Sequence, residues 1–308
     1  MSDSTPVIQI RNLSRRFRRL DAVHDLDLTV NEGSIHAFLG PNGAGKTTTI
    51  RMLMNITRPS SGEATVLGTP SRRLGQRDFE QIGYVSENQK LPLWMTVAQL
   101  MNYLRPLYPT WDNAFAEKLL TDFDLPRGQK LKHLSRGMRM KAALVGALAF
   151  RPRLLVLDEP FSGLDPLVRE EFLEGIIELT AQEKWTIFIS SHDIDEVERL
   201  ADQVAIINQG SLLLSESVED LLQRFRKVSF TSANENEAVA SLPNHWLSGQ
   251  SSGHHVSFFE TRFDEAKTHD LIRSRFGEVK DLAVESISLR EIYLVLARNF
   301  KTANPAKS

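Results

Sequence analysis

The chain has 308 residues, which is enough for one large core and a second, smaller domain. Its 37 Lys and Arg residues nearly balance 39 Asp and Glu residues, so the overall charge gives no support to a nucleic-acid partner. The lack of cysteine excludes disulfides, thiol catalysis and cysteine-ligated metal, and no apolar stretch approaches the ~20 residues that cross a bilayer.

Residues 1–6 carry no basic and apolar export signal, so we expect a soluble, cytoplasmic chain. Short apolar or alternating stretches then predict five early strands, at 7–10, 22–30, 34–39, 64–67 and 82–85. Four arginines surround Phe17 between the first two of these strands. They form either a basic patch that faces a polyanion or an anionic membrane, or a solvated turn, and the turn is favoured.

The third predicted strand leads into a phosphate-binding loop of the form G-x-x-x-x-G-K-T, and a predicted helix follows it. In this context the backbone N–H groups and the helix N-terminus bind the phosphates of a nucleoside triphosphate. Lys46 is expected to reach the β- and γ-phosphates, and the Thr47 hydroxyl to ligate Mg²⁺. The predicted nucleotide-binding residues of this loop are Gly40, Pro41, Asn42, Gly43, Ala44, Gly45, Lys46, Thr47 and Thr48.

The pattern becomes helical from residue 92 to 151, with breaks at Arg105-Pro106 and Leu125-Pro126. Strands return at 154–157, 186–189 and 204–207, with helices at 166–182 and 193–200. Strands that alternate with helices predict a mainly parallel sheet covered on both faces, with ligands at the carboxyl ends of its strands.

A hairpin-type turn at 208–211 ends this alternating pattern. The remaining sequence predicts helices and strands in a small α+β appendage, with helices at 218–226, 265–276 and 288–299, strands at 228–231 and 256–259, and a turn at 251–255.

Two acids, Asp158 and Glu159, follow the apolar strand at 154–157. Such a strand places Asp158 beside the phosphate loop, where it holds Mg²⁺ mostly through water, and places Glu159 where water attacks the γ-phosphate. Paired acids at a strand end also serve as caps of the next helix. Beside a complete phosphate loop, the metal and catalytic roles are favoured.

Three further motifs accompany the loop and the acidic strand, namely Leu134-Ser135-Arg136-Gly137-Met138, Ser162-Gly163-Leu164-Asp165 and Ser190-Ser191-His192-Asp193. In order and spacing the five elements resemble the ATP-binding cassette (ABC) ATPases, over roughly residues 5–215. The resemblance implies an α/β P-loop NTPase of ABC type at 5–216, with an antiparallel β subdomain and a helical subdomain inserted at about 88–150. Residues 217–308 are then a C-terminal accessory domain.

The resemblance also implies roles for single residues and the cofactors ATP and Mg²⁺. Phe17 is similar to the aromatic residue that stacks on adenine. Glu159 is similar to the carboxylate that polarises the attacking water, and His192 to the histidine that contacts the γ-phosphate, so that these two and Lys46 form the expected catalytic set.

The signature segment, residues 134–138, binds in this family the γ-phosphate that the opposite subunit holds. That role falls on Ser135 and Gly137, and Asp165 lies in the loop that communicates across the same interface. The resemblance therefore implies a second cassette subunit, either an identical copy or a paralogue, in a head-to-tail dimer around two Mg-ATP.

Two residues depart from the family pattern. Glu87 stands where glutamine is usual, and its carboxylate is predicted to ligate Mg²⁺ because it still offers a hard oxygen. Two alternatives stay open: Gln89 takes this role, or Glu87 acts as a brake on ATP-driven closure. Arg136 replaces a usual glycine in the signature segment and is expected to project toward the partner's nucleotide or toward solvent.

We expect an ATP-hydrolysing subunit that drives separate transmembrane permease subunits on the inner face of the membrane, in an exporter and without a nucleic-acid partner. By resemblance, the region of Trp94, Met95 and Tyr103 receives a cytoplasmic helix of the permease, although the core of the helical subdomain also accounts for these residue types. The alternatives are a soluble ATPase of ribosomes or chromosomes, which requires a second cassette, a heptad arm or a basic extension that the sequence lacks, and a nucleotide-sensing regulatory module.

Overall fold

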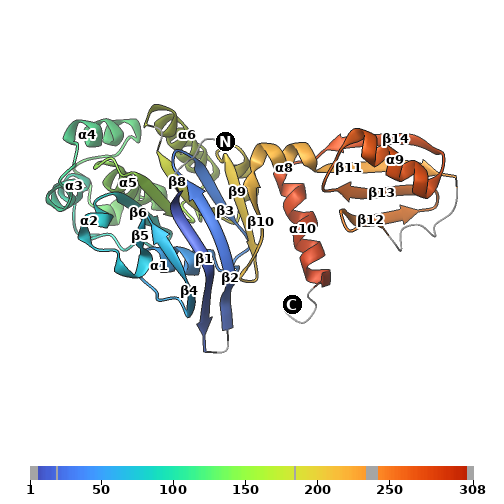
Figure 1. Cartoon of the computed structure of the whole chain (residues 1–308). Helices are drawn as coiled ribbons and strands as arrows, with labels where there is room; N and C mark the ends of the chain where they lie inside the picture. Colours follow the sequence, from blue (N-terminus) through green and yellow to red (C-terminus); the bar gives the residue numbers. More distant parts are fainter. Residues whose placement is uncertain (1–5, 19, 184, 234–241, 304–308) are drawn as a thin grey trace. The chain divides into compact units, whose positions relative to one another are not determined.

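The computed structural model describes residues 6–18, 20–183, 185–233 and 242–303, and it divides into two compact units, Met1–Ser215 and Glu216–Ser308. Three sequence-based expectations fall outside the described residues: the N-terminal segment 1–5 with the start of the cassette, Arg19 of the basic run, and the end of the appendage at 308. Figure 1 shows the elements of both units.

The first unit contains most of the strands and helices of the chain. Its strands are β1 (Pro6–Phe17), β2 (Leu20–Asn31), β3 (Ile35–Leu39), β4 (Ser61–Val66), β5 (Thr69–Pro70), β6 (Ile82–Ser86), β7 (Leu154–Asp158), β8 (Thr186–Ser191), β9 (Gln203–Asn208) and β10 (Ser211–Ser217), the last of which crosses into the second unit. Its helices are α1 (Lys46–Leu53), α2 (Gln76–Phe79), α3 (Val97–Leu104), α4 (Asn113–Asp122), α5 (Arg136–Leu148), α6 (Pro166–Glu183) and α7 (Ile194–Glu198).

A six-stranded sheet with the order β10-β9-β3-β8-β7-β6 positions the site (Figure 1). The pairs from β9 through β3, β8 and β7 to β6 are all parallel. The carboxyl ends of β3, β7 and β8 therefore meet at one edge, where the chain places the phosphate loop, the two acids and His192. The mainly parallel α/β sheet predicted from the sequence is confirmed.

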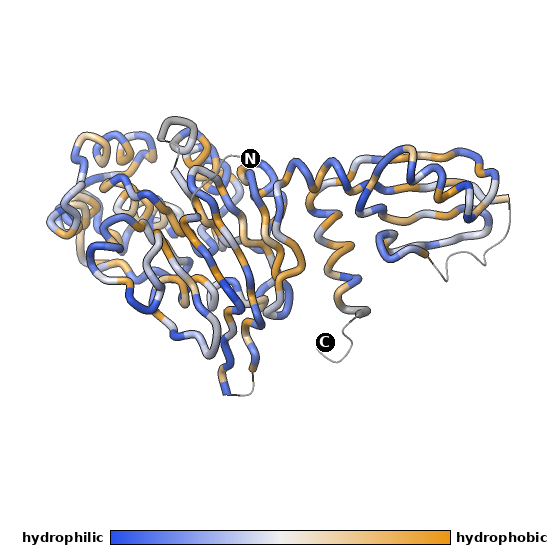
Figure 2. Tube along the Cα trace, in the orientation of Figure 1, coloured by the Kyte–Doolittle hydropathy of each residue, from blue (hydrophilic) through white to orange (hydrophobic). Residues whose placement is uncertain are grey.

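A four-stranded sheet with the order β2-β1-β4-β5 forms the antiparallel β subdomain. One cluster of buried side chains joins this sheet to the parallel sheet and to α1, and it includes Leu26, Phe38, Ile50 and Phe188. Figure 2 shows hydrophobic residues along the strands of this unit. Full burial of each such side chain stabilises the fold by roughly 1.5–3 kcal/mol, so one shared core fixes the two sheets against each other.

Helices α3, α4 and α5 fill the segment between β6 and β7, as the sequence predicts. Side-chain caps explain where each of them begins. Thr96 accepts a hydrogen bond from the N–H of Gln99, Asp112 from that of Phe115, and Ser135 from that of Met138. Helix α3 ends before Pro106, where the predicted break becomes a 3-10 turn.

The second unit contains helices and an antiparallel sheet with the order β12-β13-β11-β14. Its elements are α8 (Val218–Arg224), β11 (Arg226–Ser232), β12 (Trp246–Ser252), β13 (His255–Glu260), α9 (Glu265–Phe276), β14 (Val279–Ser286) and α10 (Leu289–Ala303). Trp246 stacks on Phe258 with ring centroids 4.0 Å apart, and Phe230 contacts Phe276 at 4.9 Å. These rings form a core separate from that of the first unit.

Two strands of the second unit differ from the expectation. The turn predicted at 251–255 is shorter in the structure and covers only residues 253 and 254. Ser251 and Ser252, the last residues of β12, pair with Val256 and His255 of β13. Strand β14 was missed because it is largely exposed and lacks a regular apolar alternation. Within the described residues, no helix combines the length and hydropathy that a membrane span requires.

Candidate nucleotide site

The loop from Gly40 to Gly45 lies against neighbouring strands so closely that two of its glycines cannot carry a side chain. A Cβ at Gly40 would clash with the carbonyl oxygen of Ile207 in β9, and one at Gly45 would lie 2.5 Å from that of Ala22 in β2. Gly45 also has a φ of 109°, in the left-handed region that favours glycine. The backbone of the loop is therefore fixed by packing, with its N–H groups ahead of α1.

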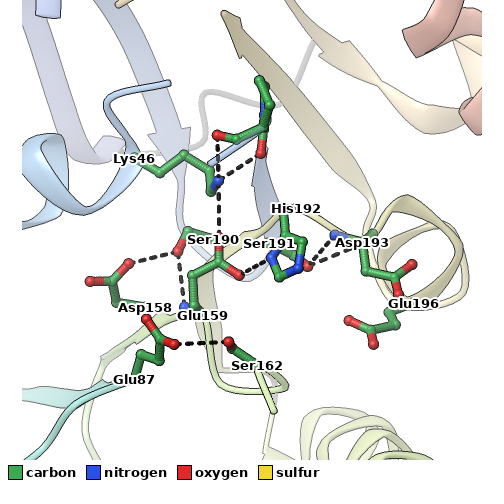
Figure 3. A network of polar contacts seen from close by, with 12 residues as sticks. Lys46, Glu87, Asp158, Glu159, Ser162, Ser190, Ser191, His192, Asp193 and Glu196 are labelled. Atoms are coloured by element: carbon green, nitrogen blue, oxygen red, sulfur yellow. Dashed lines mark hydrogen bonds and ion pairs between the residues drawn. The ribbon is translucent and has the colours of Figure 1, made fainter. Parts of the chain in front are cut away.

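Lys46 begins α1 and is buried in the loop. Its Nζ donates to the carbonyl oxygens of Gly40 and Pro41 at 2.6 and 3.1 Å, and lies 2.9 Å from Oε1 of Glu159 (Figure 3). A buried ammonium is tolerated only with such partners. Phosphate oxygens bound at this loop would compete with Glu159 for the same ammonium.

Asp158 ends β7 beside the phosphate loop. Its Oδ1 accepts hydrogen bonds from Thr47 Oγ1 at 3.0 Å and Ser190 Oγ at 2.8 Å. Burial raises the pKa of Asp158, and the two hydroxyl donors oppose this rise. The structure thus brings together the predicted pair Thr47 and Asp158, whose hard oxygens fit Mg²⁺.

Glu159 is held on both sides of its carboxylate, because Oε2 lies 2.7 Å from Nδ1 of His192 while Oε1 faces Lys46. Its backbone has a φ of 53°, an unfavourable conformation for a residue with a side chain. The N–H of Glu159 donates to Ser190 Oγ at 3.0 Å. Backbone strain that neighbouring contacts maintain is typical of functional sites.

Ser190 is a functional residue that sequence reasoning missed. Its hydroxyl donates to Asp158 and accepts from the N–H of Glu159, so it fixes the two acids relative to each other (Figure 3). The signal was present in the motif Ser190-Ser191-His192-Asp193, in which only the histidine was assigned.

The signature segment packs on the helix that follows Asp165. Ser135 caps α5, and Asp165 caps α6 by accepting from the N–H of Val168 at 3.1 Å. A Cβ at Gly137 would clash with the side chain of Val168, so glycine permits α5 to approach α6. These contacts give Ser135, Gly137 and Asp165 structural roles in the chain itself, and their roles toward a partner's nucleotide stay predictions.

Phe17 lies at the exposed end of β1, with the guanidinium of Arg15 4.2 Å from the centre of its ring. Arg15 also donates to the carbonyl oxygen of Arg58, and Arg16 pairs with Asp21. Arg15, Arg16 and Phe17 are the last residues of β1 and pair with β2, so the turn expected for the basic run is wrong for these residues, and the stacking of Phe17 on adenine stays a prediction.

Arg136 is exposed at the start of α5 and contacts this chain's own Glu87, while its expected direction toward a partner's nucleotide stays a prediction. Its Nη2 lies 3.3 Å from Oε1 of Glu87, and the same oxygen accepts from Ser162 Oγ at 2.8 Å. Gln89 Oε1 instead accepts from the N–H of Ser86. The carboxylate of Glu87 thus contacts Arg136 and Ser162, and a magnesium role for Glu87 stays a prediction.

A groove of about 600 Å³ lies beside these residues, with Glu87, Lys90, Leu93, Arg136 and Met140 in its lining. Trp94 is close to it in sequence and is 67% exposed, and Tyr103 is exposed as well. Met95 is buried in the helical subdomain, so its expected place on an interface is corrected: it belongs to the core.

Comparison with known proteins agrees with the resemblance. A family model described as ABC transporter matches residues 23–162. The bacitracin transport ATP-binding protein BcrA of Bacillus licheniformis is 32% identical over 243 residues, which cover 78% of this chain and 79% of the relative. An uncharacterized ABC transporter ATP-binding protein of Nostoc sp. is 38% identical over 203 residues, 63% of this chain and 59% of that protein. The chain spans only 59% of the length of that relative and of a similar Synechocystis protein.

A solved structure titled as the ATP binding subunit of an ABC transporter superposes with a TM-score of 0.63 at 27% sequence identity, covering 70% of this chain and 92% of that structure. The fold of the first unit is therefore that of known cassettes. The set of motifs, the geometry of the site and these similarities together show that the chain belongs to the family of ABC transporter ATP-binding proteins.

Proposed function

We propose that this chain is the ATP-hydrolysing subunit of an ABC exporter and that it drives separate permease subunits. The observation that carries the proposal is that the buried carboxylate of Glu159 contacts both Lys46 and His192. This carboxylate lies beside the lysine expected to bind phosphate, and His192 holds it in place, so it is placed to act as the general base once phosphate binds Lys46.

Each residue of the site contributes one step. The N–H groups of the loop, with Lys46, bind the phosphates, and this binding takes the ammonium of Lys46 away from Glu159. Glu159 then accepts the proton of the attacking water, while His192 keeps its carboxylate in place. Thr47 and Asp158 would hold Mg²⁺, which supplies positive charge to the phosphates.

The proposed active form is a head-to-tail dimer that holds two Mg-ATP. Ser135 sits at the start of α5, where its hydroxyl and the first N–H groups of the helix suit a phosphate of the opposite subunit. Asp165 lies on the adjacent loop and starts α6. Either an identical copy or a paralogue fits this arrangement.

The proposed membrane partner binds at the groove beside Glu87 and Met140, near the exposed Trp94. Exposed aromatic residues of this kind are enriched at the centres of protein interfaces. The direction of transport is the exporter direction expected from the sequence, and one relative, BcrA, is named for the transport of bacitracin. Attachment to the permease would place this chain on the inner face of the membrane.

The test is a pull-down of the tagged chain from detergent-solubilised membranes. We expect a membrane protein to copurify with the wild type, and Trp94→Ala to reduce its yield at least about tenfold, because interface tryptophans often dominate binding. Ile56→Ala is the matched control, since Ile56 is an exposed apolar residue elsewhere in the same unit. Capture of no membrane protein contradicts the transporter role, and equal capture by Trp94→Ala moves the interface elsewhere.

A further inference from the structure

We propose that Arg136 is a positioning residue that neutralises Glu87 and seats its carboxylate on Ser162, so that the two departures from the family pattern compensate each other. The inference rests on the proposed ATPase function and adds two residues to its site. In this proposal, Arg136 acts on the nucleotide site of its own chain.

Glu87 is joined to the catalytic strand by its backbone and to the following loop by its side chain. Its N–H donates to the carbonyl oxygen of Asp158 at 2.8 Å. Its Oε1 accepts from Ser162 Oγ at 2.8 Å, as Figure 3 shows. A change in the charge or position of Glu87 therefore acts directly beside Asp158 and Glu159, the residues proposed to hold magnesium and activate water.

Arg136 is held over the same loop by the start of α5. Ser135 caps this helix and Arg136 is its first residue, which fixes where the long side chain begins. Gly163 makes room for the guanidinium, because a Cβ at this glycine would lie 2.5 Å from Nη1 of Arg136. The arginine therefore lies against Gly163 while it pairs with Glu87.

A short hydrogen-bonded path leads from this junction to the catalytic acid. The N–H of Ser162 donates to the carbonyl oxygen of Glu159 at 3.2 Å. The contacts from Arg136 through Glu87 and Ser162 thus end on Glu159, in the turn that directly follows β7. The arginine acts through these neighbours and needs no contact with the nucleotide.

Charge explains why the two departures occur together. A carboxylate where the family has an amide adds negative charge near a site that must bind a triphosphate, and this charge disfavours nucleotide binding. The guanidinium 3.3 Å away offsets it. The side chains of Arg136 and Glu87 are 45% and 36% exposed, so their ion pair adds little to the free energy of unfolding. We therefore expect the pair to act on nucleotide affinity.

The test is a double-mutant cycle on the whole chain, with Mg-ATP affinity and ATP turnover as separate readouts. We expect Arg136→Gln to raise the Kd for Mg-ATP about three- to tenfold, because it leaves the charge of Glu87 uncompensated. Glu87→Gln removes this negative charge and should bind Mg-ATP at least as tightly as the wild type, and the double variant, which has no carboxylate left to offset, should lose the defect of Arg136→Gln. Ser162→Ala should lower kcat at unchanged Kd, because it removes the contact that leads to Glu159.

Arg153 and Glu32 form the matched control, a somewhat more exposed ion pair at 2.8 Å elsewhere in the unit. Neutralising either should change neither Kd nor kcat. The proposal is overturned if Arg136→Gln binds Mg-ATP like the wild type, or if its defect persists in the double variant. A wild type that binds Mg-ATP and never hydrolyses it contradicts the proposed function instead, while the affinity cycle still tests the pair.

Discussion

Glu159 and Glu87 occupy adjoining parts of the site and differ mainly in burial. The side chain of Glu159 is 9% exposed and lies between Lys46 and His192, whereas that of Glu87 is 36% exposed and contacts Arg136 and Ser162. Removing one partner of a buried ion pair costs about 3–5 kcal/mol, but an exposed pair is worth about 0.2–1 kcal/mol. The buried glutamate is therefore suited to the chemical step, and the exposed one to adjusting it.

The largest expected effect is on the buried side of this comparison. Glu159→Gln should lower the rate of ATP hydrolysis about 10²- to 10⁴-fold, because it removes the group that accepts the proton of water, and it should retain ATP binding. Phosphate release under saturating Mg-ATP measures the effect. Glu117→Gln, which changes an exposed glutamate paired with Arg127, is the control. Near-normal turnover of Glu159→Gln would show that another residue activates the water.

Glu196 tests whether burial destabilises the charged form of a glutamate even when an arginine lies beside it. It is buried beside Asp193 and lies 2.7 Å from Arg169. Burial raises the pKa of Glu196 to about 7, the nearby charge of Asp193 adds to the rise, and Arg169 opposes it.

Because this pKa is higher in the folded than in the unfolded chain, the protonated form favours folding, and stability is lost as pH rises from about 4.5 to about 7. Glu196→Gln should remove this loss, which we expect to be about 1–3 kcal/mol. Chemical denaturation of both proteins at pH 5 and pH 8 measures it. An equal pH dependence in the two would mean that Arg169 fully compensates the buried charge.

The sequence predicted the surroundings of Glu159 well. The phosphate loop, Asp158, Glu159 and His192 are short motifs at the ends of apolar strands, and parallel strands bring their carboxyl ends together. Each residue could therefore be placed from local pattern and sheet topology alone.

The surroundings of Glu87 could not be predicted in the same way, because they depend on contacts between segments far apart in the chain. Arg136 reaches Glu87 across 49 positions of sequence, and no local pattern encodes this pairing.

Two further predictions failed for local reasons. Met95 was placed on an interface because its residue type suits both a core and an interface. In the second unit, β14 was missed because exposed strands show little hydrophobic periodicity.

The most direct test of the central proposal, an ATPase whose sites are completed by a second subunit, is the mass of Glu159→Gln in solution, measured by light scattering. With Mg-ATP the account predicts about twice the 34.8 kDa of one chain, and a single chain's mass with Mg-ADP. Adding Ser135→Arg should return the mass to that of one chain by blocking the signature segment. A single chain's mass for Glu159→Gln under saturating Mg-ATP would contradict the account for two identical copies.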